Sequence, residues 1–355
     1  MSLRVLHLSP TWFGDASVRG GGERYPLELA RAMSRKTPTR LVSFGPRESL
    51  ECVDGFDIEV RRTWRRLRGR KGDAVGPGFM TPLVWADVVH CHQARSGLTA
   101  MATLAGRILR KKIYVTDHGG GGVNWIRRLR IGRWVDAQLA QSAFAGQTLP
   151  KLGKRTEVVF AGVDHTKYVP GSEKVEGRVV YVGRLLPHKG IEFAIRGLPS
   201  GASLEIYGRP YDADYLRFLE TEAASRPVTF HTQASDQRVI QALASACAFV
   251  MPSVYEDYRG RHQALPELVG LAPIEAMACG TAAVVSNVAG MPEIMPTDAG
   301  AIVRPGDAGD IRRALQPLTA SVDQALREGA LARDHVVRQF TWDGVAARCL
   351  SAYSD

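Results

Sequence analysis

Short runs of β-branched and aromatic residues alternate with segments of helical spacing along the chain, and the alternation restarts once near the middle. Strands are predicted at 4–10, 39–45, 87–92, 112–119 and 157–163, and again at 178–184, 203–209, 227–233, 248–253 and 282–287. Parallel strands need crossover connections, and parallel sheets are covered on both faces. The pattern therefore predicts an α/β fold with two Rossmann-like, doubly wound parallel-sheet domains facing a cleft.

A polar segment at 161–174, containing Pro170, Gly171 and Ser172, predicts a linker between the two halves. The chain of 355 residues can bury two cores.

No apolar run approaches the roughly 18–20 residues that span a bilayer. The N-terminal run suits a first strand better than a signal peptide. Five scattered cysteines without a CxxC pair predict reduced thiols and a cytoplasmic protein.

Two carboxylates follow the predicted strand at 248–253. Ligands of open parallel sheets bind beyond the carboxyl ends of the strands, so residues just after each strand are the candidates. Glu267 and Glu275 stand eight residues apart, with a helix opening near Pro273. They can accept hydrogen bonds from sugar hydroxyls, and the helix start can offer N–H groups to anionic oxygens. A solvated loop residue and a helix-start residue favoured by the helix dipole are an equal alternative.

Two cations follow the predicted strand at 178–184. Arg184 ends that strand, and Lys189 comes five residues later, where another helix is expected to begin. A guanidinium can bind two oxygens at once and an ammonium adds a mobile point charge, so the pair suits a diphosphate. Two ordinary surface cations are the alternative.

Glycines and a histidine mark the first half. Gly20, Gly21 and Gly22 lie between the first predicted strand and a helix, where the main chain can approach a phosphate or sugar closely. The run is not GxGxxG and no P-loop lysine follows, which disfavours dinucleotide and P-loop sites. His118 precedes four glycines, where an imidazole can donate to a sugar hydroxyl or a departing phosphate oxygen.

Two further patterns are interpreted without a metal. His90 and His92 flank Cys91, but neighbouring residues of a strand face opposite sides, so the three do not converge easily. Asp212 and Asp214 form a DxD triplet at a predicted helix start, where aspartate has a local capping role. We therefore predict no metal site and no cofactor.

Taken in order, these segments resemble the retaining GT-B glycosyltransferases of family 4. GGGERYPLELARAM is similar to the family's glycine loop and first helix, and VGRLLPHKGIEFAIRGL (182–198) to its donor-diphosphate segment. Glu267 to Glu275, followed by AMACG, matches its E-x7-E signature. FTWDGVAARCLSAY (340–353) resembles the last helix, which in the family returns to the first domain. The resemblance implies an acceptor-side domain of 1–165 plus 340–355 and a donor-binding domain of 166–339.

The resemblance also assigns roles to single residues. Arg184 and Lys189 would hold the donor diphosphate and Glu275 the ribose, while Gly21 and Gly22 would close on the diphosphate. The transferred sugar would be bound by Glu267, by the backbone of Leu268, Val269 and Gly270, and near His118. Leaving-group charge would be stabilised by cations and helix N-termini rather than by a metal.

The implied function is retaining transfer of a hexosyl group from a UDP- or GDP-linked sugar to a saccharide or lipid-linked acceptor in polysaccharide or glycoconjugate synthesis. The alternatives are a nucleotide-sugar epimerase or phosphorylase of the same fold, and a non-catalytic protein that binds sugar nucleotides or nucleic acid. The family usually has its first glutamate soon after the Pro–Ser of the preceding strand, but here VYEDYRGRHQALP (254–266) intervenes, and Leu268–Val269–Gly270 replaces the usual Phe–Gly. Both differences alter the expected wall around the transferred sugar.

Positive charge is concentrated in the first half, which suggests an acceptor partner. Of the net charge of +10, residues 1–165 account for more than the whole, with 27 Lys and Arg against 14 Asp and Glu. RRTWRRLRGRK (61–71) and WIRRLRIGRW (125–134) combine arginines with Trp64, Trp125 and Trp134. This pattern predicts peripheral binding to the anionic inner face of a membrane. A solvated basic face is the alternative. Neither nucleic acid nor an obligate protein partner is expected.

Overall fold

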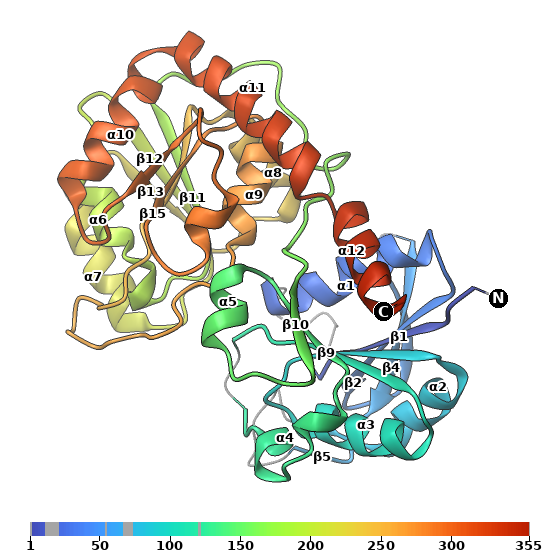
Figure 1. Ribbon diagram of the computed structural model, residues 1–355. Coiled ribbons are helices and arrows are strands. Elements are labelled where there is room, and N and C mark those ends of the chain that lie inside the picture. The colour runs from blue at the N-terminus through green and yellow to red at the C-terminus, as the bar shows by residue number, and fades with distance from the viewer. Residues whose placement is uncertain (1, 11–20, 54, 67–73, 120–121, 355) are drawn as a thin grey trace. The chain divides into compact units, whose positions relative to one another are not determined.

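The computed structural model describes residues 2–10, 21–53, 55–66, 74–119 and 122–354. The chain divides into two compact units: unit 1 is Met1–Gly162 with Trp342–Asp355, and unit 2 is Val163–Thr341. Each contains a largely parallel sheet with helices on both faces, which confirms the predicted α/β class (Figure 1). Gly20 and positions 67–71 of the first basic segment lie outside the described residues.

Unit 1 has a sheet in the order β10-β9-β8-β7-β1-β2-β4-β3, in which only the edge strand β3 pairs antiparallel, with β4. Two short strands, β5 and β6, pair separately. The strands of unit 1 are β1 (Val5–Leu8), β2 (Thr39–Gly45), β3 (Ser49–Val53), β4 (Phe56–Arg62), β5 (Arg65–Arg66), β6 (Ala74–Val75), β7 (Val88–His92), β8 (Lys112–Thr116), β9 (Ala137–Ala140) and β10 (Arg155–Val158).

The helices of unit 1 cover opposite faces of this sheet. They are α1 (Gly21–Ser34), α2 (Met80–Trp85), α3 (Gly97–Ile108), α4 (Trp125–Arg128), α5 (Ala143–Thr148) and α12 (Trp342–Ser354). Buried side chains of α2, α3 and α4 pack with one face of β1, β7 and β8. Helix α1 packs on β2 and β4 from the other face and contacts α12. The C-terminal helix is therefore part of the unit that contains the N-terminal strand.

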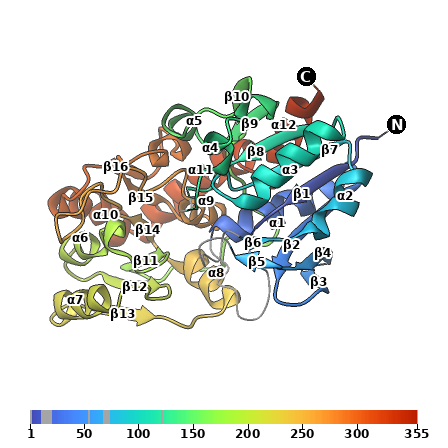
Figure 2. The same ribbon diagram turned by 90° about the horizontal axis from the view of Figure 1, so that it is seen from below.

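Unit 2 has a fully parallel sheet in the order β13-β12-β11-β14-β15-β16, which can be followed in Figure 2. Its strands are β11 (Arg178–Val182), β12 (Ser203–Tyr207), β13 (Val228–His231), β14 (Ala248–Met251), β15 (Ala283–Ser286) and β16 (Ala301–Val303). The order reverses between β11 and β14, and ligands of such sheets bind beside that switch point.

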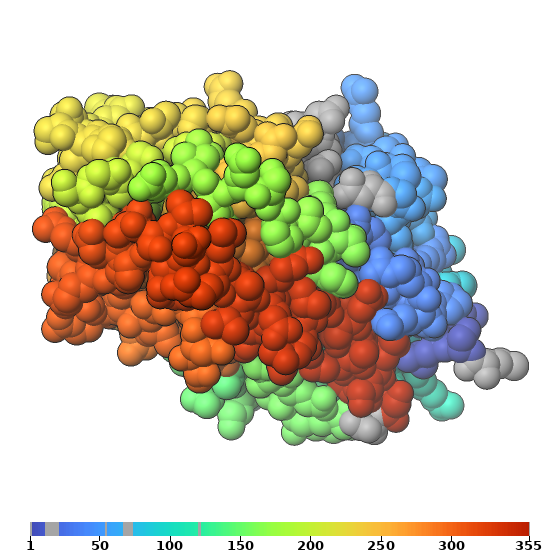
Figure 3. All heavy atoms as spheres, turned by 90° about the horizontal axis from the view of Figure 1, so that it is seen from above, coloured from blue at the N-terminus to red at the C-terminus, as the bar shows by residue number. Residues whose placement is uncertain are grey.

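The helices of unit 2 are α6 (Ile191–Arg196), α7 (Ala213–Ala223), α8 (Asp236–Ser245), α9 (Leu271–Ala278), α10 (Ala308–Ala320) and α11 (Val322–Gln339). Buried residues of α6, α7 and α10 form one core with β11, β12, β14 and β15, while α8 and α9 cover the other face. Helices α10 and α11, in orange-red, lie at the surface seen in Figure 3.

Several strands were not predicted from the sequence. Strands β3 and β4 carry exposed polar residues, β9 is an AQLA segment with little β propensity, and β16 has three residues. Their pairing comes from the neighbouring strands rather than from an intrinsic preference.

None of the helices formed by the described residues has both the length and the hydropathy needed to cross a membrane. All five cysteines are free.

Candidate functional site

A buried ion pair lies at the carboxyl end of β11 in unit 2. The Lys189 ammonium donates to the Glu267 carboxylate, and the two side chains are 9% and 11% exposed. Burial would by itself raise the pKa of Glu267, but Lys189 and a hydrogen bond from Ser253 hold it below its usual value. Glu267 is therefore a carboxylate near neutral pH. The structure brings together a cation and an anion that the sequence placed 78 residues apart.

The two oxygens of Glu267 have different surroundings. Lys189 Nζ and Ser253 Oγ, the latter at 3.0 Å, both donate to Oε1. Among the described residues, no side chain or backbone group donates to Oε2. An ionised carboxyl group can accept about four hydrogen bonds. The first oxygen therefore fixes the side chain, and the second can accept from a ligand hydroxyl.

Glycines permit the backbone turns around this pair. Gly190 has φ +59° between the 3-10 turn Pro187–Lys189 and α6, and a Cβ there would lie 2.4 Å from the Pro252 carbonyl oxygen. Gly270 has φ +85° and directly precedes α9. Both conformations are strained for residues with a side chain. These glycines fix the start of α6 after Lys189 and the start of α9 after Glu267.

The remaining predicted donor residues of unit 2 lie on the loops or helix next to the pair. Arg184 is exposed, two residues beyond β11, and its guanidinium stands 5.9 Å from the Tyr211 ring centre. Leu268 and Val269 are buried, and Glu275 is a buried residue of α9. Arg184 and Lys189 look equivalent in the sequence, but only Lys189 is buried and paired with a carboxylate.

In unit 1 the structure places the glycine run beside the predicted histidine. Gly21 and Gly22 form the exposed start of α1, and a Cβ on Gly22 would stand 3.8 Å from the Cβ of His118. Tyr25, one turn further along α1, has its ring centre 4.9 Å from that of His118 and donates its hydroxyl to the Phe160 carbonyl at 2.7 Å.

His118 belongs to a row of hydrogen-bonded side chains inside unit 1. Met33 Sδ stands 3.3 Å from His7 Nε2, and His7 Nδ1 is 2.9 Å from His92 Nε2. His92 Nδ1 is in turn 3.3 Å from His118 Nε2, and the amide nitrogen of Gln141 contacts His118 Nδ1. We refer to these five side chains as the histidine row.

The histidine row has one direction in which every contact is a hydrogen bond. Burial lowers the pKa of His7 and of His118 to about 3 and that of His92 well below its usual value, so each ring is neutral with one N–H. The Met33 sulfur has no hydrogen to donate, so His7 carries its proton on Nε2 and accepts at Nδ1. The same reasoning along the row places the protons of His92 and His118 on Nε2. Gln141 then donates to His118 Nδ1, and both ring nitrogens of His118 have partners within unit 1.

Three of the unit 1 histidines also come close enough to bind a metal ion. His7, His90 and His92 offer nitrogen atoms within 4.8 Å of one another. The sequence argument against a His90–Cys91–His92 site missed His7, which pairs with His90 from the neighbouring strand. The Cys91 side chain packs in the core on the opposite face. His90 is hydrogen-bonded to Thr116 (2.8 Å) and to the Tyr353 hydroxyl (2.7 Å), so both of its ring nitrogens have partners.

Comparison with known proteins gives this architecture a family. Residues 19–167 match the family described as Glycosyltransferase Family 4, and residues 176–321 match the one described as Glycosyl transferases group 1. The chain belongs to glycosyltransferase family 4. This membership favours sugar transfer over the epimerase, phosphorylase and non-catalytic alternatives.

Relatives of this glycosyltransferase cover most of its length. It is 26% identical to the alpha-maltose-1-phosphate synthase of Mycolicibacterium smegmatis, over 76% of this chain and 79% of that one. It is 25% identical to an MMP alpha-(1->4)-mannosyltransferase of Mycolicibacterium hassiacum, over 82% of this chain and 73% of the other.

Solved structures share the fold. Sucrose-phosphate synthase from Thermosynechococcus elongatus has a TM-score of 0.74 at 20% identity, covering 99% of this chain and 98% of its own. Anabaena HepE in complex with UDP and glucose has a TM-score of 0.72 at 15% identity, covering 99% of both chains. These similarities confirm the expected GT-B class.

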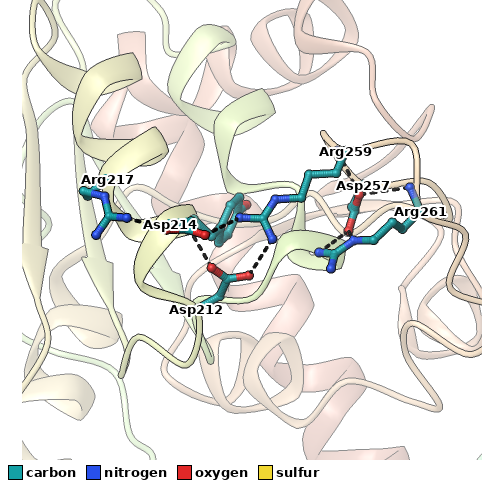
Figure 4. Close-up of polar contacts among 7 residues, drawn as sticks. Asp212, Asp214, Arg217, Asp257, Arg259 and Arg261 are labelled. Atoms are coloured by element: carbon teal, nitrogen blue, oxygen red, sulfur yellow. Dashed lines mark hydrogen bonds and ion pairs between the residues drawn. The ribbon is translucent and has the colours of Figure 1, made fainter.

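The DxD triplet of the glycosyltransferase has local partners. Asp212 is the N-cap of α7 and accepts from the Tyr215 N–H at 3.0 Å, which is the capping role predicted for it. Arg259 pairs with both carboxylates, at 3.2 Å from Asp212 and 3.3 Å from Asp214, and Arg217 also contacts Asp214 (Figure 4). These contacts connect α7 with the segment 254–266.

The tryptophans of the basic segments differ in exposure. Trp64 is 74% exposed, whereas Trp125 and Trp134 pack against the core of unit 1. The Arg128 guanidinium lies 5.4 Å from the ring centre of Trp125, and the Arg133 guanidinium lies 5.9 Å from the ring centre of Trp134. Two of the three indoles that suggested a membrane surface thus have a packing role, and Trp64 alone matches that expectation.

Proposed function

We propose that the protein transfers a hexosyl group from a UDP- or GDP-linked sugar to a hydroxyl of a saccharide or lipid-linked acceptor, with retention of anomeric configuration and without a metal. The observation that carries this proposal is the buried Lys189–Glu267 pair. It provides donors for phosphate oxygens and an oriented carboxylate oxygen for a sugar hydroxyl. HepE, crystallised with UDP and glucose, and the mannosyltransferase relative support hexose donors.

Unit 2 then binds the donor. Arg184, exposed beyond β11, and the remaining N–H groups of Lys189 bind the diphosphate, while Glu275 on α9 binds the ribose. Glu267 Oε2 accepts from a hydroxyl of the transferred sugar, and the backbone of Leu268, Val269 and Gly270 lines it. Because these cations lie where negative charge develops on the leaving diphosphate, they stabilise the transition state.

The reaction takes place on one face of the sugar. The acceptor oxygen forms its bond to the anomeric carbon as the bond from that carbon to the diphosphate oxygen breaks. The acceptor's hydroxyl proton passes to the departing phosphate oxygen. In unit 1, Gly21 and Gly22 approach the diphosphate, and His118 contacts the sugar after exchanging one of its internal hydrogen bonds.

Transfer assays with UDP-glucose, UDP-galactose and GDP-mannose test this proposal. We expect one donor to give product with the anomeric configuration of the donor, measured from the proton coupling constant of the new linkage. Arg184→Ala should reduce kcat/KM at least about 100-fold, because a charge-assisted bond that strengthens in the transition state is lost. An inverted product, or wild-type turnover by Arg184→Ala, would refute the mechanism.

We further propose that the acceptor is lipid-linked and that the protein binds peripherally to the anionic cytoplasmic face of the membrane. Trp64 supports this proposal, because it is largely exposed beside Arg62, Arg65 and Arg66. Indole rings settle at the headgroup level, and arginines pair with lipid phosphate. Arg61 contributes less free charge, because it pairs with Glu59.

Sedimentation with anionic vesicles at low salt tests the membrane proposal. Changing Arg62, Arg65 and Arg66 to serine should release the protein from vesicles. The matched control changes three exposed arginines of unit 2, Arg238, Arg312 and Arg327, to serine and should leave binding unchanged. Equal release by both triple variants would mean that vesicle binding depends on net charge alone. If the wild type does not bind vesicles, the membrane proposal is wrong.

A further inference from the structure

The segment 254–266, which makes the stretch between Ser253 and Glu267 longer than the resemblance leads one to expect, folds as a short hairpin on unit 2. Glu256 and His262 form an antiparallel bridge, and the Gln263 N–H donates to the Tyr255 carbonyl at 2.7 Å. Gly260, with φ +71°, lies in the turn, where a left-handed conformation favours glycine. The inserted residues are therefore ordered by backbone hydrogen bonds, and we refer to them as the inserted hairpin.

Side chains fix the inserted hairpin to α7. Figure 4 shows Arg259 reaching both Asp212 and Asp214 at the start of α7. The Tyr258 ring stacks on Phe218, also in α7, with ring centres 4.4 Å apart and planes within 10°. Charge pairing and aromatic packing thus hold the hairpin on the side of the sheet that α6 and α7 cover. Helix α9 lies on the opposite side.

A pocket of about 470 Å³ lies between the inserted hairpin and two loops at the carboxyl ends of β11 and β12. This volume is within the range of small-molecule sites, about 300–1,000 Å³. The three segments that line it contribute Leu186, Pro187 and His188, then Tyr211 and Asp212, and finally Asp257, Arg261, His262 and Gln263. None of the residues that we assign to the donor lines this pocket.

The lining has no unbalanced charge. Asp257 accepts from the Arg261 guanidinium at 2.9 Å, and Asp212 is paired with Arg259. Burial, with the neighbouring Lys189, lowers the pKa of His188 to about 4, so this imidazole is neutral at pH 7. A phosphate or carboxylate would meet no net positive charge here, since the carboxylates at the pocket balance its guanidinium groups.

The remaining groups match a neutral polyhydroxy ligand. The neutral His188 imidazole and the Gln263 amide can each donate and accept a hydrogen bond, as a sugar hydroxyl does. Leu186 and Pro187 supply apolar surface, and Tyr211, 47% exposed, supplies an aromatic ring for the C–H face of a pyranose. Small-molecule sites commonly combine apolar walls with a few oriented polar groups.

We propose that this pocket binds a neutral sugar unit of the acceptor, separate from the sugar being transferred. The inference rests on the proposed function. The pocket adjoins the donor residues without including them, because His188 directly precedes Lys189 and Gln263 comes four residues before Glu267. Unit 2 then binds an acceptor sugar next to the Lys189–Glu267 pair. The inserted hairpin, which lines the pocket, determines the acceptor specificity.

Saturation-transfer-difference NMR on the full chain tests the pocket with methyl α-glucopyranoside, methyl α-mannopyranoside and maltose as probes. We expect at least one probe to bind, and the double change His262→Ala with Gln263→Ala to weaken it at least about tenfold. Arg217→Ala, which alters an exposed partner of Asp214 outside the pocket, is the matched control. Tyr211 is left unchanged, because its ring also lies near Arg184.

Two outcomes overturn the proposal: no probe binds the wild type, or the double variant binds it as well as the control does. A third arm repeats the experiment with saturating UDP-glucose or GDP-mannose. If the nucleotide sugar leaves the probe bound, the pocket holds an acceptor sugar. If it displaces the probe, the pocket holds the transferred sugar and the acceptor assignment is wrong. Failure of every nucleotide sugar to bind would count against the proposed function, not against the pocket.

Discussion

The buried polar groups of the two units are stabilised in different ways. In unit 1 the groups next to Gly22 are neutral imidazoles, each hydrogen-bonded to the next, and they end at His118. In unit 2 the groups next to α9 are an ammonium and a carboxylate, which neutralise each other. A neutral network fixes geometry without charged groups, whereas an ion pair holds two charged groups in place, each with further hydrogen-bonding capacity for a ligand. The two units should therefore be sensitive to different changes: unit 2 to the loss of one partner of its ion pair, and unit 1 to acidification.

The largest expected effect is on unit 2. Lys189→Ala leaves Glu267 buried without its cation, and breaking one side of a buried pair typically costs about 3–5 kcal/mol. We expect this loss in denaturant unfolding, and Lys189→Ala with Glu267→Gln should recover a substantial part of it. Arg184→Ala is the control, since an exposed side chain should change stability little. Equal stability of the two single variants would remove the distinction drawn between these cations.

The next effect is on unit 1 and appears on acidification. His7 and His118 have a pKa of about 3 when folded, so an unfolded chain binds more protons below pH 6.5. Their contribution is complete above about pH 6.5 and is lost as the pH falls toward 3. At pH 5.5 the lowered pKa of each histidine reduces the free energy of unfolding by about 1 kcal/mol. In unit 2, His188 is the described histidine whose pKa is lowered, to about 4.

Hydrogen exchange at pH 7.5 and 5.5, corrected for intrinsic rates, checks this difference. Peptides of α1 and β7 should lose more protection than peptides of α9 and β14. Greater loss in unit 2 would contradict the neutral assignment of the histidine row.

A smaller effect tests the direction of the histidine row. Met33→Leu conserves volume but removes the acceptor of the His7 Nε2–H, which should cost about 1 kcal/mol. Met277→Leu, at a fully buried position of α9, is the matched control. Nitrogen-15 spectra of the imidazoles should show the proton of His118 on Nε2. A proton on Nδ1 would mean that the row runs in the opposite direction.

The smallest expected effect is that of metal removal. Transfer should survive EDTA, because Asp212 and Asp214 are paired with Arg259, and the donor diphosphate has cations of its own in the proposed scheme. Metal analysis of the purified protein should find less than one equivalent of zinc at the His7, His90 and His92 group. A strict requirement for manganese or magnesium, or a stoichiometric zinc ion, would contradict this expectation.

The sequence predicted most of the fold because apolar β-branched runs determine buried parallel strands. The edge strand β3 and the short β16 were missed, since their pairing depends on neighbours distant in the sequence. Arg184 and Lys189 could be proposed because they follow a strand, and Glu267 because it stands eight residues before Glu275 at the start of a helix. The Lys189–Glu267 pair could not be predicted, because nothing local indicates a contact across 78 residues.

The histidine row and the pocket show the same limit. His7 was missed because a single histidine in a first strand has no distinctive pattern, and its partners come from β7 and α1. The segment 254–266 was recognised as unusual by its length alone. Its contacts with α7 depend on the tertiary fold, and so does the pocket beneath it.

Donor binding by the wild type and Arg184→Ala tests the central claim, that unit 2 recognises the diphosphate of a nucleotide sugar. Titration calorimetry with UDP-glucose and GDP-mannose, without metal, measures each Kd, with Arg217→Ala as the control. Loss of a charge-assisted hydrogen bond, about 1.5–3 kcal/mol, predicts roughly 10- to 100-fold weaker binding by Arg184→Ala and unchanged binding by the control. If neither nucleotide sugar binds the wild type, or if Arg184→Ala binds as tightly as Arg217→Ala, the account is contradicted.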